Sequence, residues 1–222
     1  MGSTETTTAL TCPRTPAFDA SNLDSVAQAL GGPHGISLTQ SWLDKPEANF
    51  TSATVWTGWR DDEFFVFAKM DDADIFSRAT QANQRLWELG DSLEIFLKPD
   101  GQEAYSELQV SPNNQQLQLR YEHAAALDWA KSNNSIEKAV RNIAFKSSTW
   151  VHPETQLWFA LAQIPVSAVR DQSRTLPGSE WQVSFCRYDY THGRSEPVIS
   201  STSNFTKPDF HRTSEWRTMK FI

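Results

Sequence analysis

Two groups of closely spaced carboxylates have the clearest capacity for chemistry in this sequence. They are Asp71, Asp72 and Asp74, and Glu88, Asp91 and Glu94. Carboxylate oxygens bind hard cations such as calcium, and paired carboxylates supply general acids and bases. The spacing of the first group does not match an EF-hand loop, and a solvated turn after a strand is the favoured explanation for it. The carboxylates alone therefore define neither a catalytic nor a metal site.

Motifs of common catalytic sites are absent from the sequence. There is no GxSxG, HExxH or CxxC motif and no glycine-rich phosphate loop. The five histidines, at positions 34, 123, 152, 192 and 211, show no metal-ligand spacing. Cys12 and Cys186 are too few for a disulfide framework, so one bridge between them and two free thiols both stay open.

The aromatic residues are more informative, because the nine tryptophans exceed what one core readily buries. Trp158 and Trp181 lie in strand patterns, and we expect them to pack between two sheets. Trp87 in the segment RLWELG and Phe205 in the segment TSNFTKP have polar neighbours instead. A pyranose stacks its C–H face on an aromatic ring and needs polar partners for its hydroxyls. Such loop aromatics suit sugar recognition, although packing at the edge of a core explains a single one equally well.

The elements that must position these residues are mostly short strands. Helical spacing predicts one short helix over Asn22–Leu30, with Asn22 as its cap. Apolar runs at 50–60 and 64–70 predict a hairpin whose second strand is buried on both faces. Further strands are expected at 91–98, 105–110, 117–121, 139–145, 157–163, 181–190, 198–201 and 216–222.

This pattern predicts an all-β fold, a two-sheet antiparallel β-sandwich with one or two short helices. There is no repeated alternation of strands and helices, which disfavours Rossmann and TIM architectures. We expect a polar N-terminal arm over residues 1–15 and a single sandwich domain over residues 16–222.

The charge of the chain excludes two classes of partner. Twenty-seven acidic and twenty basic residues give a formal net charge of −7, without a Lys/Arg run that could follow a phosphate backbone. We therefore expect no nucleic-acid partner and no anionic membrane surface. No apolar stretch approaches the roughly 20 residues that span a bilayer, and the first residues lack the pattern of a secretory signal.

One segment resembles a known family. The run LWELGDSLEIFLKPDG over residues 86–101 resembles the signature of family-9 carbohydrate-binding modules, in which a similar Trp-Glu stretch leads into a Tyr-containing strand. Residues 105–112, YSELQVSP, take the place of that strand. The segment WQVSFCRYD over residues 181–189, a polar loop, and PDF at 208–210 are similar in order and type to the end of the family pattern.

The resemblance implies a β-sandwich related to DOMON domains that binds the end of a glycan between two aromatic side chains without cleaving it. Trp87 corresponds to the first stacking residue and Phe205 to the second. Glu94 corresponds to the strand glutamate, and Asn204 or a neighbour to a loop amide. Gln109 stands where the family can carry a sugar-contacting Arg. Phe for Trp and Gln for Arg indicate a different sugar from the family's usual gluco-configured ligand, or a weaker site.

The same resemblance sets the expected surroundings of the domain. Its partner would be an oligosaccharide or polysaccharide, its location extracellular or periplasmic, and its context a glycoside-active enzyme. It implies no cofactor apart from structural calcium, whose ligands the sequence does not place.

Two other functions stay open. Relatives of this sandwich bind haem through a Met paired with a His or Lys, which makes Met70 and His192 candidates for an electron-transfer domain. A polysaccharide-active enzyme would use a carboxylate pair such as Glu88 and Glu94. Neither alternative has a diagnostic motif.

Overall fold

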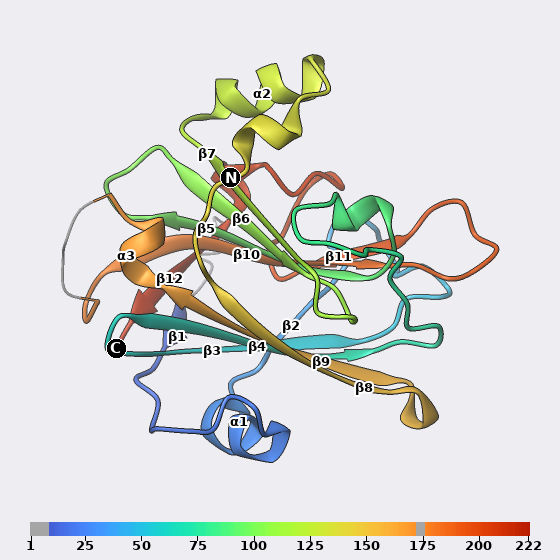
Figure 1. Cartoon of the computed structure of the whole chain (residues 1–222), viewed down its shortest axis with the longest axis horizontal. Helices are drawn as coiled ribbons and strands as arrows, with labels where there is room; N and C mark the ends of the chain where they lie inside the picture. Colours follow the sequence, from blue (N-terminus) through green and yellow to red (C-terminus); the bar gives the residue numbers. More distant parts are fainter. Residues whose placement is uncertain (1–8, 172–175) are drawn as a thin grey trace, which may run out of the picture.

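The computed structural model describes residues 9–171 and 176–222, and in it two β-sheets pack face to face (Figure 1). The strands of sheet A are β1 (Leu10–Cys12), β5 (Ser92–Pro99), β6 (Tyr105–Val110), β7 (Gln116–Tyr121), β10 (Glu180–Asp189), β11 (Val198–Ser201) and β12 (Arg217–Phe221). The strands of sheet B are β2 (Ile36–Ser37), β3 (Ala53–Arg60), β4 (Glu63–Asp71), β8 (Lys146–His152) and β9 (Leu157–Pro165).

The strand order is β1-β12-β10-β5-β6-β7 in sheet A, with β11 paired to β10, and β2-β3-β4-β9-β8 in sheet B. The strands pair antiparallel except β1 and β12, which are parallel. The expected two-sheet sandwich is confirmed.

The helices lie outside the two sheets. They are α1 (Leu23–Leu30), α2 (Ala124–Ser132) and α3 (Val166–Val169), with 3₁₀ turns η1 (Leu86–Glu88), η2 (Ile136–Ala139), η3 (Pro153–Thr155) and η4 (Thr213–Glu215). As predicted, the Asn22 side chain caps α1 by accepting a 3.0 Å hydrogen bond from the Ser25 amide. Within residues 9–171 and 176–222, no helix is long and apolar enough to cross a membrane.

Alternating side chains explain how the strands join the two layers. In β5, Leu93, Ile95 and Leu97 enter the core between the sheets, while Glu94 and Phe96 point to the outer face of sheet A. Strand β4 is buried on both faces, as predicted, because α1 covers the outer side of sheet B. The outer face of β5 therefore carries the polar Glu94, whereas the outer face of β4 is apolar because α1 covers it.

The core between the sheets contains the two tryptophans that the sequence places there. Trp158 and Trp181 are 0% and 1% exposed, and the Trp181 ring lies 5.9 Å from that of Phe64 in an edge-on arrangement. Burial of their large apolar surface stabilises the fold. These two tryptophans therefore have a structural role in the core between the sheets.

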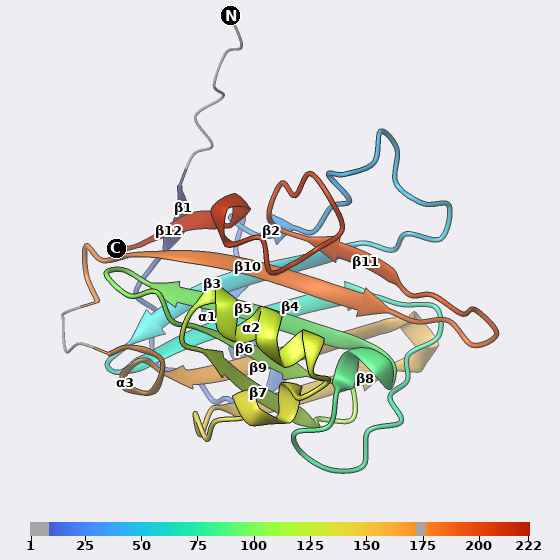
Figure 2. The ribbon, with the colours of Figure 1, turned by 90° about the horizontal axis from the view of Figure 1, so that it is seen from above.

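A second hydrophobic cluster lies on the outer face of sheet A. It joins strand residues to the segments that cross this face, and its larger members are Phe96, Tyr105, Leu119, Tyr121, Phe205, Phe210 and Trp216. Helix α2 and the segment of η1 both stand on this side of the sheet (Figures 1 and 2). The outer face is thus partly covered, and the polar side chains between the covering segments become enclosed.

Two expectations about the elements are wrong, and two elements of the structure were not expected. Residues 139–145 form no strand, because η2 ends at Ala139 and Ala144 has a positive φ of 56°, which interrupts an extended chain. The next strand is β8, whose largely polar sequence gave little strand signal, and the alanine-rich α2 was not expected either. The sandwich also begins before residue 16, since Leu10 in β1 pairs with Met219 in β12.

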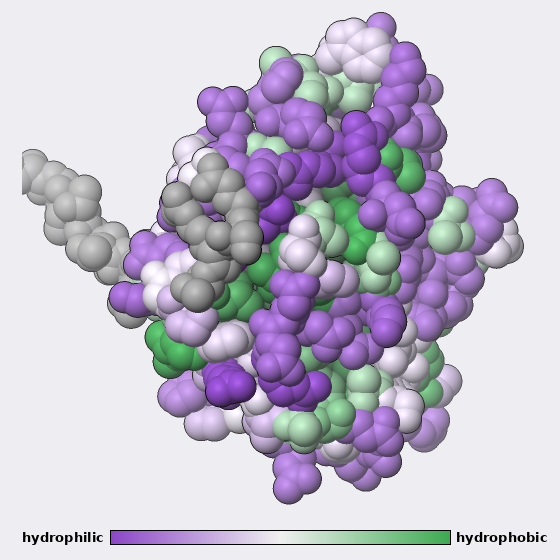
Figure 3. All heavy atoms as spheres, turned by 60° about the vertical axis from the view of Figure 1, so that its left-hand side comes forward, coloured by the Kyte–Doolittle hydropathy of each residue, from purple (hydrophilic) through white to green (hydrophobic). Residues whose placement is uncertain are grey.

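The surface shows no broad apolar area on the face in Figure 3. Hydrophilic residues cover most of that face, and the hydrophobic ones form small patches between them. Among the described residues the exposed large hydrophobic side chains are Leu43, Trp129, Val151 and Ile222. Isolated exposed apolar side chains of this kind are ordinary.

Candidate functional site

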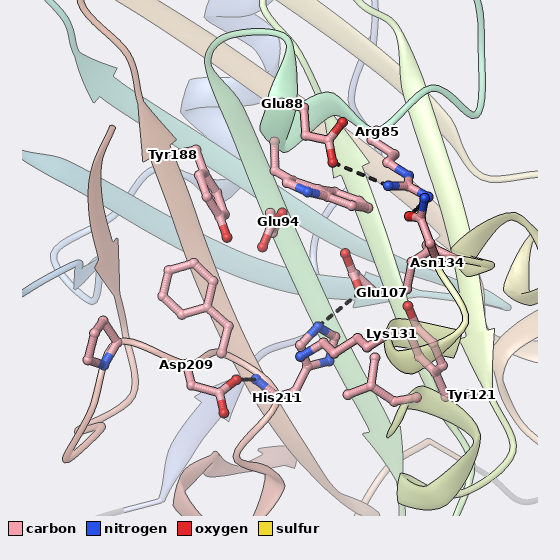
Figure 4. Close-up of a pocket in the computed structure, with 15 residues that line it drawn as sticks. Arg85, Glu88, Glu94, Glu107, Tyr121, Lys131, Asn134, Tyr188, Asp209 and His211 are labelled. Carbon is pink, nitrogen blue, oxygen red and sulfur yellow. Dashed lines mark hydrogen bonds and ion pairs between the residues drawn. The ribbon is translucent and has the colours of Figure 1, made fainter. Parts of the chain in front are cut away.

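A pocket of about 500 Å³ opens on the outer face of sheet A (Figure 4). Its floor takes one side chain from each of four adjacent strands, β10, β5, β6 and β7: Tyr188, Glu94, Glu107 and Tyr121. Its walls come from residues 85–88, 127–136 and 208–211. The volume suits a small-molecule ligand.

Two carboxylates on the floor share one amide donor. Glu94 and Glu107 are each 3% exposed. Behind them, Gln109 is fully buried, and its Nε2 donates hydrogen bonds to Glu94 Oε1 at 2.6 Å and to Glu107 Oε1 at 2.5 Å. Gln109, expected to contact a sugar, does not line the pocket. It positions the carboxylates that do.

Burial keeps this carboxylate pair from being fully ionised. It raises the pKa of Glu94 well above its usual value, and the neighbouring charge of Glu107 adds to the rise. It also raises the pKa of Glu107 to about 7, against the opposing influence of Gln109 and Lys131. The two carboxyls therefore interact as they titrate, and burial of the pair favours its protonated form.

His211 lines the pocket next to the carboxylate pair and contributes no positive charge to it. Its Nδ1 lies 3.0 Å from the Tyr105 hydroxyl, and its Nε2 lies 3.6 Å from Glu107 Oε2. Burial, with a smaller contribution from Lys131, lowers the pKa of His211 to about 3. The imidazole is therefore neutral at ordinary pH, and its approach to Glu107 is not an ion pair.

Trp87 stands half-buried in the wall formed by η1. Its carbonyl accepts a 2.5 Å hydrogen bond from the Tyr190 hydroxyl, which ties η1 to the end of β10. Arg85 joins this wall to the next one, with Nη2 2.8 Å from Glu137 Oε1 and 2.9 Å from Asn134 Oδ1. Figure 4 shows Arg85 between Glu88 and Asn134 at this rim. The walls are therefore fastened to each other.

The aromatic side chains around the pocket differ from those expected. Phe205 is 1% exposed and does not line the pocket, so it offers no face to a ligand, contrary to the sequence-based expectation. Its ring lies 5.9 Å from that of Phe210, which does line the pocket and meets Tyr188 edge-on at 5.7 Å. Phe205 therefore packs against Phe210 within the outer hydrophobic cluster.

The structure brings two of the five expected residues, Trp87 and Glu94, into the pocket lining. Asn204 is exposed and lies outside it, and the amide in the wall is that of Asn134. The sequence reasoning missed Glu107, Lys131, Tyr188 and His211. A signal existed for Glu107, which is two residues from Gln109 and therefore on the same face of β6.

The members of the two carboxylate groups seen in the sequence do not stay together in the structure. Asp72 and Asp91, one from each group, meet Asp189, and their carboxylate oxygens lie within 4.8 Å of one another in the buried interior. Asp71 accepts a hydrogen bond from Ser52, and Asp74 from the His192 backbone. Among the described residues, Asp72, Asp91 and Asp189 form the acidic cluster whose spacing could hold a metal ion.

Arg187 already supplies positive charge there. Its Nη2 lies 3.0 Å from Asp72 Oδ2 and 3.1 Å from Asp189 Oδ2. Asp91 accepts two backbone N–H bonds, at 2.7 and 2.8 Å, and burial next to Asp72 raises its pKa to about 8. The arrangement does not fit a metal ion, because a cation would face the guanidinium at close range. Cys12 and Cys186 are buried free thiols.

The structure also places the residues suggested for the two alternative functions, haem binding and polysaccharide cleavage. Met70 is fully buried in the core between the sheets, whereas His192 is exposed and lies 2.8 Å from Asp74 Oδ2. Glu88 and Glu94 both line the pocket, with Glu88 at the rim 3.4 Å from Arg85 Nη1.

A sandwich with a pocket of carboxylates and phenols, edged by a half-buried tryptophan, offers the polar groups and the aromatic surface that a small polar ligand with an apolar face needs. The family model described as "Carbohydrate family 9 binding domain-like" matches residues 25–220. The chain belongs to this family and is a carbohydrate-binding domain. The resemblance of residues 86–101 to family 9 is confirmed.

Solved structures share the fold. A candidate carbohydrate-binding protein from Bacteroides uniformis matches with a TM-score of 0.68 and 17% identity, over 97% of this chain and 100% of that one. A family-9 module from Caldicellulosiruptor kristjanssonii matches in complexes with cellotriose (TM-score 0.64, 15% identity, 96% and 92% coverage) and glucose (TM-score 0.63, 16% identity, 96% and 95% coverage). A comparison with curated protein sequences finds no match.

Proposed function

We propose that the pocket on sheet A is the carbohydrate site and that it holds the terminal unit of a glycan. The observation that carries this proposal is the position of Trp87 beside two buried carboxylates in one pocket. The indole takes the C–H face of the sugar, and Glu94 and Glu107 accept hydrogen bonds from its hydroxyls. The glucose and cellotriose complexes of the Caldicellulosiruptor module support a saccharide of this size.

Walls on three sides favour a chain end over the middle of a chain. Residues 85–88, 127–136 and 208–211 surround the floor, and Arg85 fastens the first wall to the second. A polysaccharide passing through would need two open ends, whereas a terminal unit needs one. We therefore expect oligosaccharides to bind no more than modestly better than the matching monosaccharide.

Calorimetry with monosaccharides and oligosaccharides, including glucose and cellotriose, tests the proposal. A few hydrogen bonds and one stacking surface give an expected Kd between about 1 μM and 1 mM. Trp87→Ala should weaken binding at least tenfold, while the control Trp129→Ala, at an exposed position outside the pocket, should leave it unchanged. Saturable binding that survives Trp87→Ala would place the sugar elsewhere.

Hydrolysis is the second candidate, because Glu88, Glu94 and Glu107 share the pocket and the last two have raised pKa values. We propose that the domain binds its ligand without cleaving it, as its family is one of binding modules. Prolonged incubation with a bound oligosaccharide should release no product. Product formation that Glu94→Gln abolishes would establish an enzyme instead.

We also propose that the domain acts outside the cytoplasm, alongside a polysaccharide-active enzyme, because polysaccharide substrates are found there. Fractionation of the producing cells tests the location, and co-purification with an enzyme that degrades the bound glycan tests the association.

A further inference from the structure

The carboxylate pair on the pocket floor receives few hydrogen bonds from the described residues. Gln109 gives one N–H to each carboxylate, but Glu107 Oε2 is buried and has no hydrogen-bond partner among the described residues. The nearest ring nitrogen, His211 Nε2, is 3.6 Å away on a neutral imidazole. An unpartnered buried carboxylate oxygen is costly unless the carboxyl is protonated or a ligand donates to it.

Charged and titratable groups face the pair from every surrounding element. They are Tyr121 on β7, Cys186 and Tyr188 on β10, Arg85 and Glu88 at η1, Lys131 on α2, and Asp209 and His211 on the last wall. Arg85 is occupied by Glu88 and Glu137. Lys131 is exposed, and within the described chain no carboxylate oxygen lies within 4 Å of its Nζ. Figure 4 shows it beside His211.

An ammonium group has the chemistry that these two carboxylates would bind best. It donates up to three hydrogen bonds and brings the positive charge that two adjacent carboxylates need, and charge-assisted bonds are about twice as strong as neutral ones. A hydroxyl in the same place donates once and brings no charge. An acetamide is neutral and bulkier, and its single N–H donates one hydrogen bond.

We propose that the terminal sugar preferred by this pocket carries a free amino group, which Glu94 and Glu107 bind as an ammonium. This inference rests on the proposed function and names its ligand class, an unacetylated hexosamine at the end of a glycan. Trp87 binds the ring as it would bind any pyranose, and the carboxylate pair distinguishes the amine.

Matched sugar triplets separate the amine from the configuration of the ring. Calorimetry would compare glucosamine, glucose and N-acetylglucosamine, then the corresponding galactose and mannose series. In at least one series the amino sugar should bind ten times more tightly than its two partners. Its binding should also release protons, because the ammonium favours the ionised form of the pair; titrations in buffers of different ionisation enthalpy measure this.

Glu107→Gln keeps the shape of the side chain and removes the charge. It should weaken hexosamine binding about tenfold and change the binding of the neutral hexose less than threefold. Glu103→Gln, on an exposed loop, is the matched control. Glu94→Gln is a second test if Glu107→Gln does not fold, which thermal unfolding would reveal.

The outcomes distinguish this inference from the proposed function. Equal binding of the amino, neutral and N-acetyl sugars, lost in Trp87→Ala, would overturn the amine preference and keep the carbohydrate site. A preference that persists in both Glu107→Gln and Glu94→Gln would overturn the assignment to the pair. If no sugar of the panel binds, both proposals fail.

Discussion

The hydroxyl of Tyr190 donates a 2.5 Å hydrogen bond to the backbone carbonyl of Trp87. The bond connects the residue after β10 with the 3₁₀ turn that carries the pocket tryptophan. A sugar-stacking ring must be held in place before the ligand arrives, because ordering it on binding costs free energy. The orientation of Trp87 therefore depends on a residue outside the pocket lining.

Tyr190→Phe should weaken sugar binding by about two- to tenfold, the equivalent of one hydrogen bond of about 0.5–1.5 kcal/mol. The ring remains, so its edge-on contact with Phe76 at 6.5 Å is kept. Calorimetry on the single variants and on the double variant with Trp87→Ala measures the coupling. If Tyr190→Phe weakens binding further once Trp87 is absent, the hydroxyl acts by another route.

Phe205→Ala should lower the free energy of unfolding by about 3–5 kcal/mol, because it leaves a cavity beneath Phe210 in the outer cluster. Urea unfolding measures the loss, and Phe205→Leu should cost less. The fraction that stays folded should still bind sugar. A stable Phe205→Ala protein without sugar binding would restore the role that the family pattern implies for this residue.

The stability of the domain should fall as pH rises from 4.5 to about 7 through the contribution of Glu107. Burial raises the folded-state pKa of Glu107 from 4.5 to about 7, so the folded protein keeps a proton that the unfolded chain releases. The contribution is complete below pH 4.5 and is lost by about pH 7, up to about 3 kcal/mol. Urea unfolding of wild type and Glu107→Gln across this range measures the difference.

His211 has the opposite effect on the pH dependence of stability, and this effect is the same in wild type and in Glu107→Gln. Its pKa is lowered to about 3 in the fold, so the unfolded chain takes up a proton below about pH 6.5 and stability falls with decreasing pH. The comparison with Glu107→Gln removes this shared background. Parallel pH profiles of the two proteins would contradict the raised pKa of Glu107.

Chelation of divalent cations should leave the melting temperature unchanged, because Arg187 provides the charge among Asp72, Asp91 and Asp189. Arg187→Met should instead lower the free energy of unfolding by about 3–5 kcal/mol, since it leaves buried carboxylates without their partner. Differential scanning calorimetry with EDTA and with calcium checks both statements. A clear drop in melting temperature with EDTA would mean that a bound ion stabilises the wild-type fold.

The sequence by itself determined the layers of the sandwich and part of the site. Alternation along β5 separates Leu93 and Ile95 from Glu94, and this period of two is a local property of the chain. The segment around Trp87 was identified in the same way, by residues close together in the sequence. Both features survive in the structure because each depends on neighbours along the chain.

Only the tertiary structure decided the rest of the pocket. Glu94 and Glu107 meet through the register of β5 on β6, and Phe210 rather than Phe205 reaches the pocket because of how a loop packs on the outer face of sheet A. Strand register and loop packing depend on residues far apart in the sequence. Local patterns therefore place a side chain on a face of the sheet, and the assembled sheet determines which side chains share a site.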